Sequence, residues 1–351
     1  MEQFENILIV QTAFPGDLIL TLPLAQVLKK HFPSAQIDFV VIPKTAELLP
    51  NNPTISEVIV YDKRGKDSGF SGLMRKVNSL RANKYDIAFI PHRSFRSAIL
   101  VWLSKIPLRV GFDKSKAKLI YSHKIQYDSK IHEIERNISL LTAININNVP
   151  KEIPHLYPSF HDKKKVGLVL SEIGVQHLNT LVGIAPGSVW ATKRWLEERY
   201  AELIEKLTGK GFHILLLGGS EDFELCKRID NAVPSKHIYN MAGKLSFLQS
   251  AELIERCLVV VTNDSAPLHI ATAMRVPTVS IFGATTPEFG FGPYGDLHRI
   301  VETDGLSCRP CSIHGGEKCP IGTFDCMKEI SSEKVFNTVI SLLEKTPSGG
   351  I

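Results

Sequence analysis

Short apolar runs of four or five residues alternate with longer amphipathic stretches along most of the chain. Runs of this length are typical of strands buried in a parallel sheet, and the stretches between them have the spacing of helices. The alternation therefore predicts repeated β–α–β units and an α/β fold.

The first half of the chain contains five of these apolar runs. We predict strands at residues 7–10, 37–41, 57–61, 87–90 and 109–111. The clearest helix covers residues 17–32, because Leu18, Leu22, Ala25 and Leu28 recur at helical spacing. Further helices are predicted at residues 70–81, 94–103 and 132–144.

The same pattern restarts in the second half. Strands are predicted at residues 181–185, 213–217, 258–262 and 278–282. Helices are predicted at residues 196–210, 222–232, 247–256, 267–274 and 332–344. For the last of these helices, packing back on the N-terminal domain is an open alternative.

Residues 148–179 separate the two halves and hold three prolines, a run of three lysines and little periodicity. We place an interdomain connection there and predict domains at residues 1–165 and 166–351. A chain of 351 residues is also longer than a single hydrophobic core usually supports. Two domains of roughly 150–180 residues are therefore expected. Each would be a Rossmann-like, doubly wound parallel sheet, and ligands would bind at the carboxyl ends of the strands, in a cleft between the facing domains.

Composition and charge narrow the class of protein. The chain is 44% hydrophobic and 22% charged, as in ordinary soluble proteins. A formal net charge of +5 is too small to indicate nucleic-acid binding, although it suits an anionic substrate or a membrane surface. The acidic start lacks the pattern of a signal peptide, and no apolar run approaches the ~18–20 residues that cross a bilayer. We expect a cytoplasmic protein with no transmembrane segment and no nucleic-acid partner.

The turn after the predicted strand 258–262 carries the strongest chemical signal. Ser265 is a good N-cap, and Pro267 suits the first turn of a helix, which leaves free N–H groups and a positive helix end. Such a helix start binds anions. His269 is close enough to reach the same phosphate, and Asp264 can orient a hydroxyl or an N–H group. The alternative is that Asp264 and Ser265 only cap the helix and that His269 belongs to the core.

Two further turns are expected at the same edge of this sheet. Gly187 and Ser188 can offer N–H and hydroxyl donors, and Lys193 a mobile positive charge. After the next strand, a glycine pair precedes Glu221, whose carboxylate could accept hydrogen bonds from a ribose or a base. The alternatives are a plain turn in the first case and a solvated carboxylate in a helical first turn in the second.

The segment 264–269 resembles the Asp-Ser/Thr-Gly-x-x-His motif of glycosyltransferase family 9, the lipopolysaccharide heptosyltransferases. The resemblance extends over essentially the whole chain through four further matches in the same order. These are Phe14-Pro15-Gly16-Asp17, Lys193-Arg194-Trp195, Met241-Ala242-Gly243 and Phe282-Gly283-Ala284-Thr285-Thr286-Pro287. One position departs from the motif: Ala266 replaces glycine and adds a Cβ where backbone should approach a phosphate.

The resemblance implies a GT-B fold, with an N-terminal acceptor-binding domain and a C-terminal donor-binding domain. It also implies an inverting transfer of heptose from ADP-heptose to the inner core of lipopolysaccharide. Asp17 matches the proposed general base, and Lys193 with the 264–269 helix start would stabilise the departing ADP. The implied donor site comprises Gly187, Ser188, Lys193, Glu221, Met241, Asp264, Ser265, Ala266 and His269.

No cofactor or metal is required for this chemistry, in agreement with the lack of an Asp-x-Asp motif. Three alternatives remain: another sugar nucleotide or acceptor, a non-catalytic sugar-nucleotide-binding protein, and for Asp17 a purely helix-stabilising carboxylate. A nicotinamide-dependent oxidoreductase is disfavoured, because residues 13–16 lack the Gly-x-Gly-x-x-Gly pattern.

The acceptor side is marked mainly by basic residues. Arg64, Arg93 and Arg96 are candidates to bind a phosphorylated, carboxylate-rich inner core, although scattered solubilising charge is the alternative. Such a substrate implies a peripheral protein at the cytoplasmic face of the inner membrane of a Gram-negative bacterium. We expect this protein to be a monomer.

Four cysteines near the C-terminus could hold a metal, although we expect none. Cys308, Cys311, Cys319 and Cys326 contain a single Cys-x-x-Cys pair, whereas a structural zinc site normally has two. Reduced thiols are favoured, with zinc and disulfides as open alternatives.

Overall fold

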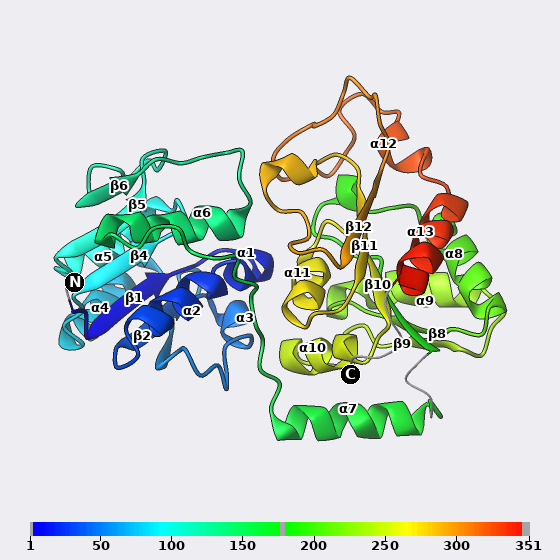
Figure 1. Ribbon diagram of the computed structural model, residues 1–351, viewed down its shortest axis with the longest axis horizontal. Coiled ribbons are helices and arrows are strands. Elements are labelled where there is room, and N and C mark those ends of the chain that lie inside the picture. Colours follow the sequence, from blue (N-terminus) through cyan, green and yellow to red (C-terminus); the bar gives the residue numbers. More distant parts are fainter. Residues whose placement is uncertain (1–2, 176–179, 346–351) are drawn as a thin grey trace. The chain divides into compact units, whose positions relative to one another are not determined.

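The computed structural model describes residues 3–175 and 180–345, and its contacts divide the chain into a first unit, residues 1–157, and a second unit, residues 158–351. Each unit contains one six-stranded sheet in which every strand pair is parallel (Figure 1). The α/β class and the doubly wound parallel sheets are therefore confirmed.

The first sheet has the strand order β3-β2-β1-β4-β5-β6. The bounds of these strands are β1 Asn6–Val10, β2 Gln36–Val41, β3 Glu57–Val60, β4 Ile87–Ile90, β5 Leu108–Phe112 and β6 His123–Ile125. The first unit has the helices α1 Pro15–Ile19, α2 Leu22–His31, α3 Pro43–Ala46, α4 Gly69–Ala82, α5 Phe95–Leu103, α6 Glu133–Ser139 and the 3-10 helix η1 Leu140–Ile144.

The second sheet has the order β12-β11-β10-β7-β8-β9, which is the same topology when its strands are counted from its own start. Its strands are β7 Leu181–Ala185, β8 His213–Leu216, β9 Ile238–Asn240, β10 Val259–Asn263, β11 Thr278–Phe282 and β12 His298–Glu302. Its α-helices are α7 Phe160–Glu172, α8 Glu197–Gly209, α9 Phe223–Ala232, α10 Phe247–Glu255, α11 Ala266–Ala273, α12 Asp325–Lys328 and α13 Ser332–Lys345. Its described 3-10 helices include η3 Ala191–Lys193, η4 Ser220–Asp222 and η5 Pro287–Phe289.

The helix predicted at residues 17–32 is two helices, α1 and α2. The side chain of Asn137 in α6 donates to the carbonyl of Leu20, 3.1 Å away, and Gln11 donates to the Thr21 hydroxyl at 2.9 Å. These side chains satisfy polar groups where the helix is interrupted. The interruption therefore depends on residues far along the chain, which helical spacing alone does not reveal.

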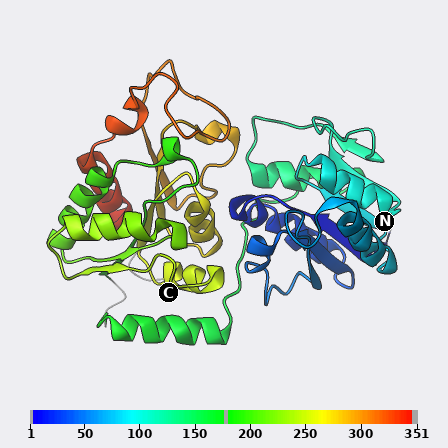
Figure 2. The same ribbon diagram turned by 180° about the vertical axis from the view of Figure 1, so that it is seen from behind.

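The predicted connection at residues 148–179 contains a helix of 13 residues, α7. Ser159 and Asp162 form a capping box at its start, and Val166 and Leu170 are buried where α7 lies along α10 (Figure 2). The division between the units falls before α7 rather than within it. The lysine run and the exposed Phe160 and Leu168 hide its short apolar stripe in the sequence.

The last helix, α13, packs on the second unit, against α8 and β12. Val335, Val339 and Leu342 belong to the same apolar core as Trp195 and Tyr200. The strands β6, β9 and β12 were not predicted, because they lie at sheet edges and are short or carry polar residues.

Two glycines allow a test of this packing with the same chemical change. A Cβ added at Gly111 in β5 would lie 2.4 Å from the ring of Tyr121, which is buried, whereas a Cβ at Gly167 in α7 would meet nothing within 4 Å. We expect Gly111→Ala to lower the free energy of unfolding by about 1–3 kcal/mol through overpacking. Gly167→Ala should raise it by about 0.5–1 kcal/mol because alanine is the better helix former. Urea denaturation measures the free energy of unfolding of both variants. Changes of the same sign and size in the two variants would contradict the packing described here.

Candidate functional site

The carboxyl ends of β7 and β10 lie side by side at the centre of the second sheet. The strand order reverses between these two neighbours, and in open α/β sheets ligands bind at the carboxyl side of such a position. The turn 186–195 follows β7, and Asp264 and Ser265 follow β10. Most of the predicted donor-site residues therefore share one edge of this sheet.

Asn263 connects these two turns. Its side chain is fully buried at the end of β10 and makes three hydrogen bonds. The amide donates to the carbonyl of Pro186 at 2.8 Å, while the carbonyl oxygen accepts from the Trp195 N–H at 3.1 Å and the Tyr200 hydroxyl at 3.0 Å. Sequence analysis gave Asn263 no role of its own, since a buried asparagine and an exposed turn asparagine look alike in a sequence.

Lys193 and Asp264 form an ion pair with a distance of 2.6 Å between Nζ and Oδ2. Both side chains are largely buried, at 14% and 8% exposure, so water screens the pair only partly. The Thr285 hydroxyl, which follows β11, donates to the same Asp264 oxygen at 2.7 Å. The sequence predicted a mobile charge on Lys193, whereas the structure shows this charge held in place by Asp264.

The start of α11 lies beside this ion pair. Ser265 occupies the N-cap position, yet its side chain makes no capping hydrogen bond and instead donates to the carbonyl of Asn263 at 3.4 Å. Ala266 and Pro267 form the start of the helix, and His269 is buried one turn on, with 5% exposure. A helix start without a side-chain cap, next to a lysine, is suited to a phosphate.

The turns after β8 and β9 border the same edge. A Cβ at Gly187 would lie 2.1 Å from a carboxylate oxygen of Asp222, whose other oxygen accepts the Gly219 N–H at 3.0 Å. Glu221 is exposed in η4, and Met241 is buried after β9. Asp222 was not singled out from the sequence, although it lies between two of the predicted turns.

The segment with the four cysteines packs on the Lys193 turn. Thr192 and Gly316 exchange two hydrogen bonds, of 3.0 Å and 2.7 Å, and a Cβ at Gly315 would lie 3.1 Å from Cγ of Lys193. Cys311 donates its N–H to the carbonyl of Ala284 at 2.9 Å. All six cysteines are free thiols, and among the described residues no group of three or more His, Cys, Asp or Glu side chains has an arrangement that could hold a metal ion.

In the first unit, Asp17 lies in the first turn of α1, after β1. Its carboxylate accepts the N–H of Phe14 at 3.2 Å and so stabilises the helix start. The residue remains partly exposed. A helix-stabilising role is therefore present, and it does not exclude a second, chemical role for the same carboxylate.

The three predicted acceptor-site arginines have different surroundings. Arg96 is committed to the protein, because its guanidinium donates to the Tyr61 hydroxyl and to the carbonyls of Lys63 and Asp67. Arg93 lies over the ring of Tyr127, 4.6 Å from its centroid, and Arg64 is exposed. Arg96 is therefore held by hydrogen bonds within the protein, whereas Arg93 contacts an aromatic ring and Arg64 is exposed.

The sequence did not single out Lys63 and His92. These residues follow β3 and β4, at the carboxyl ends of strands of the first sheet. Lys63 donates to the carbonyl and hydroxyl of Thr12, at 2.9 Å and 3.2 Å. Burial, with help from Arg64 and Arg96, lowers the pKa of Lys63. Burial and the charges of Lys63 and Arg93 lower the pKa of His92 to about 4, so this imidazole is neutral at pH 7. Neither Lys63 nor His92 belongs to a distinctive sequence motif, and the fold is what brings the two residues together.

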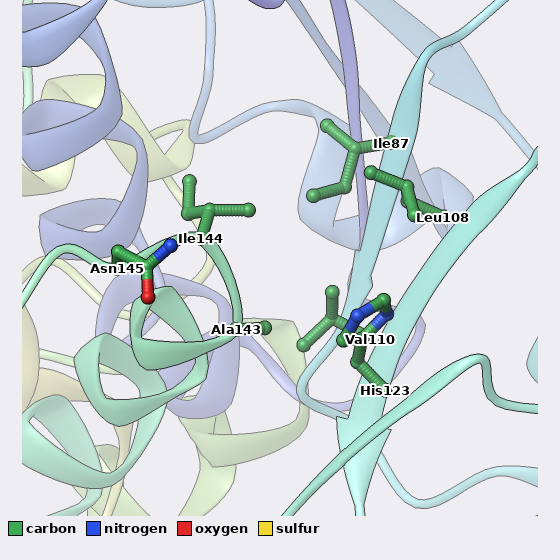
Figure 3. A pocket seen from close by; sticks show the side chains of 7 residues that line it. All are labelled: Ile87, Leu108, Val110, His123, Ala143, Ile144 and Asn145. Atoms are coloured by element: carbon green, nitrogen blue, oxygen red, sulfur yellow. The ribbon is translucent and has the colours of Figure 1, made fainter. Parts of the chain in front are cut away.

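A hollow of about 290 Å³ in the first unit lies elsewhere (Figure 3). Its lining includes Ile87, Leu108 and His123, which are the first residues of β4, β5 and β6. It therefore opens at the amino ends of these strands, away from Asp17, and contains none of the predicted site residues. No helix among residues 3–175 and 180–345 is long and apolar enough to cross a membrane.

The Asn263 hydrogen bonds give a direct test of how the second-unit turns are held. Asn263→Ala would leave the buried Pro186 carbonyl, Trp195 N–H and Tyr200 hydroxyl without this partner, and each such group costs about 1–3 kcal/mol. We expect the free energy of unfolding to fall by at least about 2 kcal/mol. The exposed Asn337→Ala on α13 should change it by less than about 0.5 kcal/mol. Similar denaturation midpoints for the two variants would refute the role of Asn263.

Comparison with known proteins agrees with this architecture. The family model described as glycosyltransferase family 9 (heptosyltransferase) matches residues 73–318. Lipopolysaccharide heptosyltransferase 2 of Salmonella typhimurium is 28% identical over 349 residues, which cover 97% of this chain and 99% of the relative.

Solved structures show the same fold. The family 9 glycosyltransferase of Veillonella parvula superimposes with a TM-score of 0.89 at 25% identity, covering 99% of both chains. ADP-heptose lipopolysaccharide heptosyltransferase II of E. coli gives a TM-score of 0.79 at 24% identity, covering 97% of this chain and 99% of the other. The GT-B fold expected from the resemblance is thereby confirmed. The chain belongs to glycosyltransferase family 9 and is a glycosyltransferase.

Proposed function

We propose that this enzyme transfers heptose, with inversion, from ADP-heptose to the inner core of lipopolysaccharide. The observation that carries the proposal is the Lys193–Asp264 ion pair beside the start of α11. A cation and a helix start at the carboxyl ends of β7 and β10 suit the diphosphate of a nucleotide sugar. The names of the relatives, lipopolysaccharide heptosyltransferase 2 and ADP-heptose lipopolysaccharide heptosyltransferase II, support the donor and the acceptor.

In the proposed reaction, an acceptor hydroxyl attacks the anomeric carbon of heptose on the face opposite the diphosphate. The bond from carbon to the phosphate oxygen breaks, and its electron pair leaves with ADP. Lys193 and the first N–H groups of α11 stabilise that charge. Asp17 accepts the proton of the hydroxyl. No step requires a cofactor.

The other predicted donor residues have supporting roles in this proposal. Gly187 and Ser188 line the β7 turn, and Glu221 and Met241 follow β8 and β9, where the nucleoside would extend. Ser265, Ala266 and His269 surround the phosphate, and Arg64 and Arg93 contribute positive charge to the acceptor side. Arg96 acts only by holding the loop that follows β3.

The acceptor is part of a membrane lipid, so we place the enzyme at the cytoplasmic face of the inner membrane, as a peripheral protein. Phe70 and Phe95 are 76% and 54% exposed at the starts of α4 and α5, and Arg64 and Lys66 are exposed in the adjoining loop. Apolar side chains next to basic ones favour an anionic membrane surface.

The donor is tested by measuring binding of ADP-, UDP- and GDP-sugars by calorimetry, followed by product analysis with a defined inner-core acceptor. ADP-heptose is expected to bind and to yield a product with inverted anomeric configuration. Transfer from another sugar nucleotide alone would replace this donor assignment, and binding without any product would favour the non-catalytic alternative.

Substitution of Asp17 tests the general base. Asp17→Asn should lower kcat about 10²–10⁴-fold, because the amide cannot accept the proton. Its oxygen can still accept the Phe14 N–H, so the fold and ADP binding should persist. The matched control is Asp86→Asn, since Asp86 accepts the N–H groups of Glu5 and Asn6 at the opposite edge of the same sheet. Near-normal turnover of Asp17→Asn would reject the assignment.

Substitution of Lys193 tests leaving-group stabilisation. Lys193→Met should lower kcat about 10²–10³-fold and weaken ADP binding, because one positive group at the diphosphate is lost. Lys206→Met removes a lysine that pairs with Glu333 at 2.7 Å on the surface, and this control should behave like the wild type. The comparison uses steady-state kinetics and ADP calorimetry; equal kinetics for the two variants would exclude Lys193 from the diphosphate site.

A further inference from the structure

The segment 309–316 contacts the surroundings of the Lys193–Asp264 ion pair at both of its ends. It belongs to the long loop between β12 and α12 (Figure 1). One end contacts the turn after β11, and the other end contacts the turn after β7. The proposed chemistry uses Lys193 but gives this segment no task.

Arg309 holds the first end of the segment. Its side chain is 8% exposed and forms an ion pair with Glu302 at 2.7 Å. Its guanidinium also donates to the carbonyl of Thr285 at 2.9 Å. The Thr285 hydroxyl in turn donates to the Asp264 oxygen that pairs with Lys193. Arg309 therefore fixes the turn that supplies this carboxylate with its second partner.

Thr192, which precedes Lys193, holds the second end. Its side chain is buried, and its hydroxyl accepts the N–H of Gly316 at 2.7 Å. The N–H of Thr192 donates to the carbonyl of Gly316 at 3.0 Å. Buried polar groups need partners within the protein, so this reciprocal pair restricts the backbone at Thr192. The backbone of Lys193, the next residue, is restricted with it.

Gly315 lies against the Lys193 side chain itself. A Cβ at this position would lie 3.1 Å from Cγ of Lys193, 3.2 Å from Oγ1 of Thr192 and 3.3 Å from Cβ of Trp190. Its φ of +83° lies in the left-handed region that favours glycine. The Ser312 hydroxyl accepts the Gly315 N–H at 2.8 Å and donates to its carbonyl at 2.9 Å, which fixes this turn. The Lys193 stem is therefore bounded by backbone that is itself held in place.

We propose that the segment 309–316 positions Lys193 for the diphosphate of the donor, with Thr192 and Gly315 as positioning residues. This inference rests on the proposed role of Lys193. A free lysine side chain loses rotamer freedom when it binds a ligand, whereas a side chain restricted beforehand loses less. Negative charge on the leaving oxygen develops as the bond breaks, so a displaced ammonium group stabilises the transition state less. The segment acts only through Lys193.

The first test makes the same substitution at two neighbouring glycines. The methyl group of Gly315→Ala would meet the Lys193 stem, whereas a Cβ at Gly316 would lie 3.7 Å from the Lys318 carbonyl oxygen, an ordinary contact. We expect Gly315→Ala to lower kcat about 5–50-fold and to weaken ADP binding about 3–10-fold, because Lys193 is displaced. Gly316→Ala should stay within about twofold of the wild type. Transfer kinetics and ADP calorimetry measure both variants, and equal effects would overturn the inference.

The second test removes the hydroxyl contact. Thr192→Val keeps the shape of threonine but cannot accept the Gly316 N–H, so kcat should fall about 3–30-fold. Thr192→Ser keeps the hydroxyl and should restore kcat to within about threefold of the wild type. Thr208→Val, on α8, removes a hydroxyl that donates to the Glu205 carbonyl and should behave like the wild type. A loss in Thr192→Val that serine does not restore would overturn the inference. If Thr192→Val fails to fold, the two glycine variants still decide.

Double variants separate positioning from general structural damage. In the Lys193→Met background, neither Gly315→Ala nor Thr192→Val should lower kcat further, since the side chain they position is gone. An additive loss would overturn the inference. Wild-type kinetics of Gly315→Ala and Thr192→Val, together with an impaired Lys193→Met, would overturn it and leave the proposed function standing. Absence of transfer by the wild type with every sugar nucleotide would instead reject the proposed function, and this inference with it.

Discussion

The buried side chain of Asn263 makes the hydrogen bonds on which the turns at the centre of the second sheet depend. A parallel sheet brings the ends of β7 and β10 together, but it does not determine the path of the turns that follow them. Asn263 does so with three hydrogen bonds to Pro186, Trp195 and Tyr200. Because these groups are shielded from water, each needs a protein partner, and the turn that carries Lys193 has little freedom to take another course.

The two units use the same topology for different electrostatic purposes. In the second unit, Asp264 holds the cation of Lys193 at a helix start, which in the proposed reaction would stabilise the departing ADP. In the first unit, Asp17 lies in the first turn of α1, and α6 carries the largely buried ion pair of Glu133 and Arg136. In the proposed reaction, the leaving group needs the positive charge of the second unit, and Asp17 of the first unit accepts a proton.

The sequence predicted most of the strands and helices, because their apolar residues recur at clear spacing. It missed features that depend on residues far apart in the chain. The interruption between α1 and α2 is held by Asn137, and the edge strand β9 is only three residues long. The capping box of Ser159 and Asp162 was a usable signal for α7 that the lysine run obscured.

Local motifs predicted that Asp264, Ser265 and His269 lie at the turn from β10 into α11, and the structure places them there. The sequence could not predict contacts that follow from burial, as for Asn263, or from a partner far along the chain, as for Lys63 and Thr12. Arg96 shows a related limit, since its charge suggested a ligand site and the sequence did not reveal its hydrogen bonds to Tyr61, Lys63 and Asp67. Charge is visible in a sequence, whereas the partners of that charge are not.

The contact between Thr192 and Gly316 has a consequence for engineering. The backbone groups of Gly316 and the side chain and N–H of Thr192 complete each other's hydrogen bonds, and Gly315 lies against the Lys193 stem with φ of +83°. A chimaera that imports only residues 186–195 from a related enzyme would separate these partners. Exchange of donor specificity between family members therefore requires the transplanted module to include residues 312–316 as well.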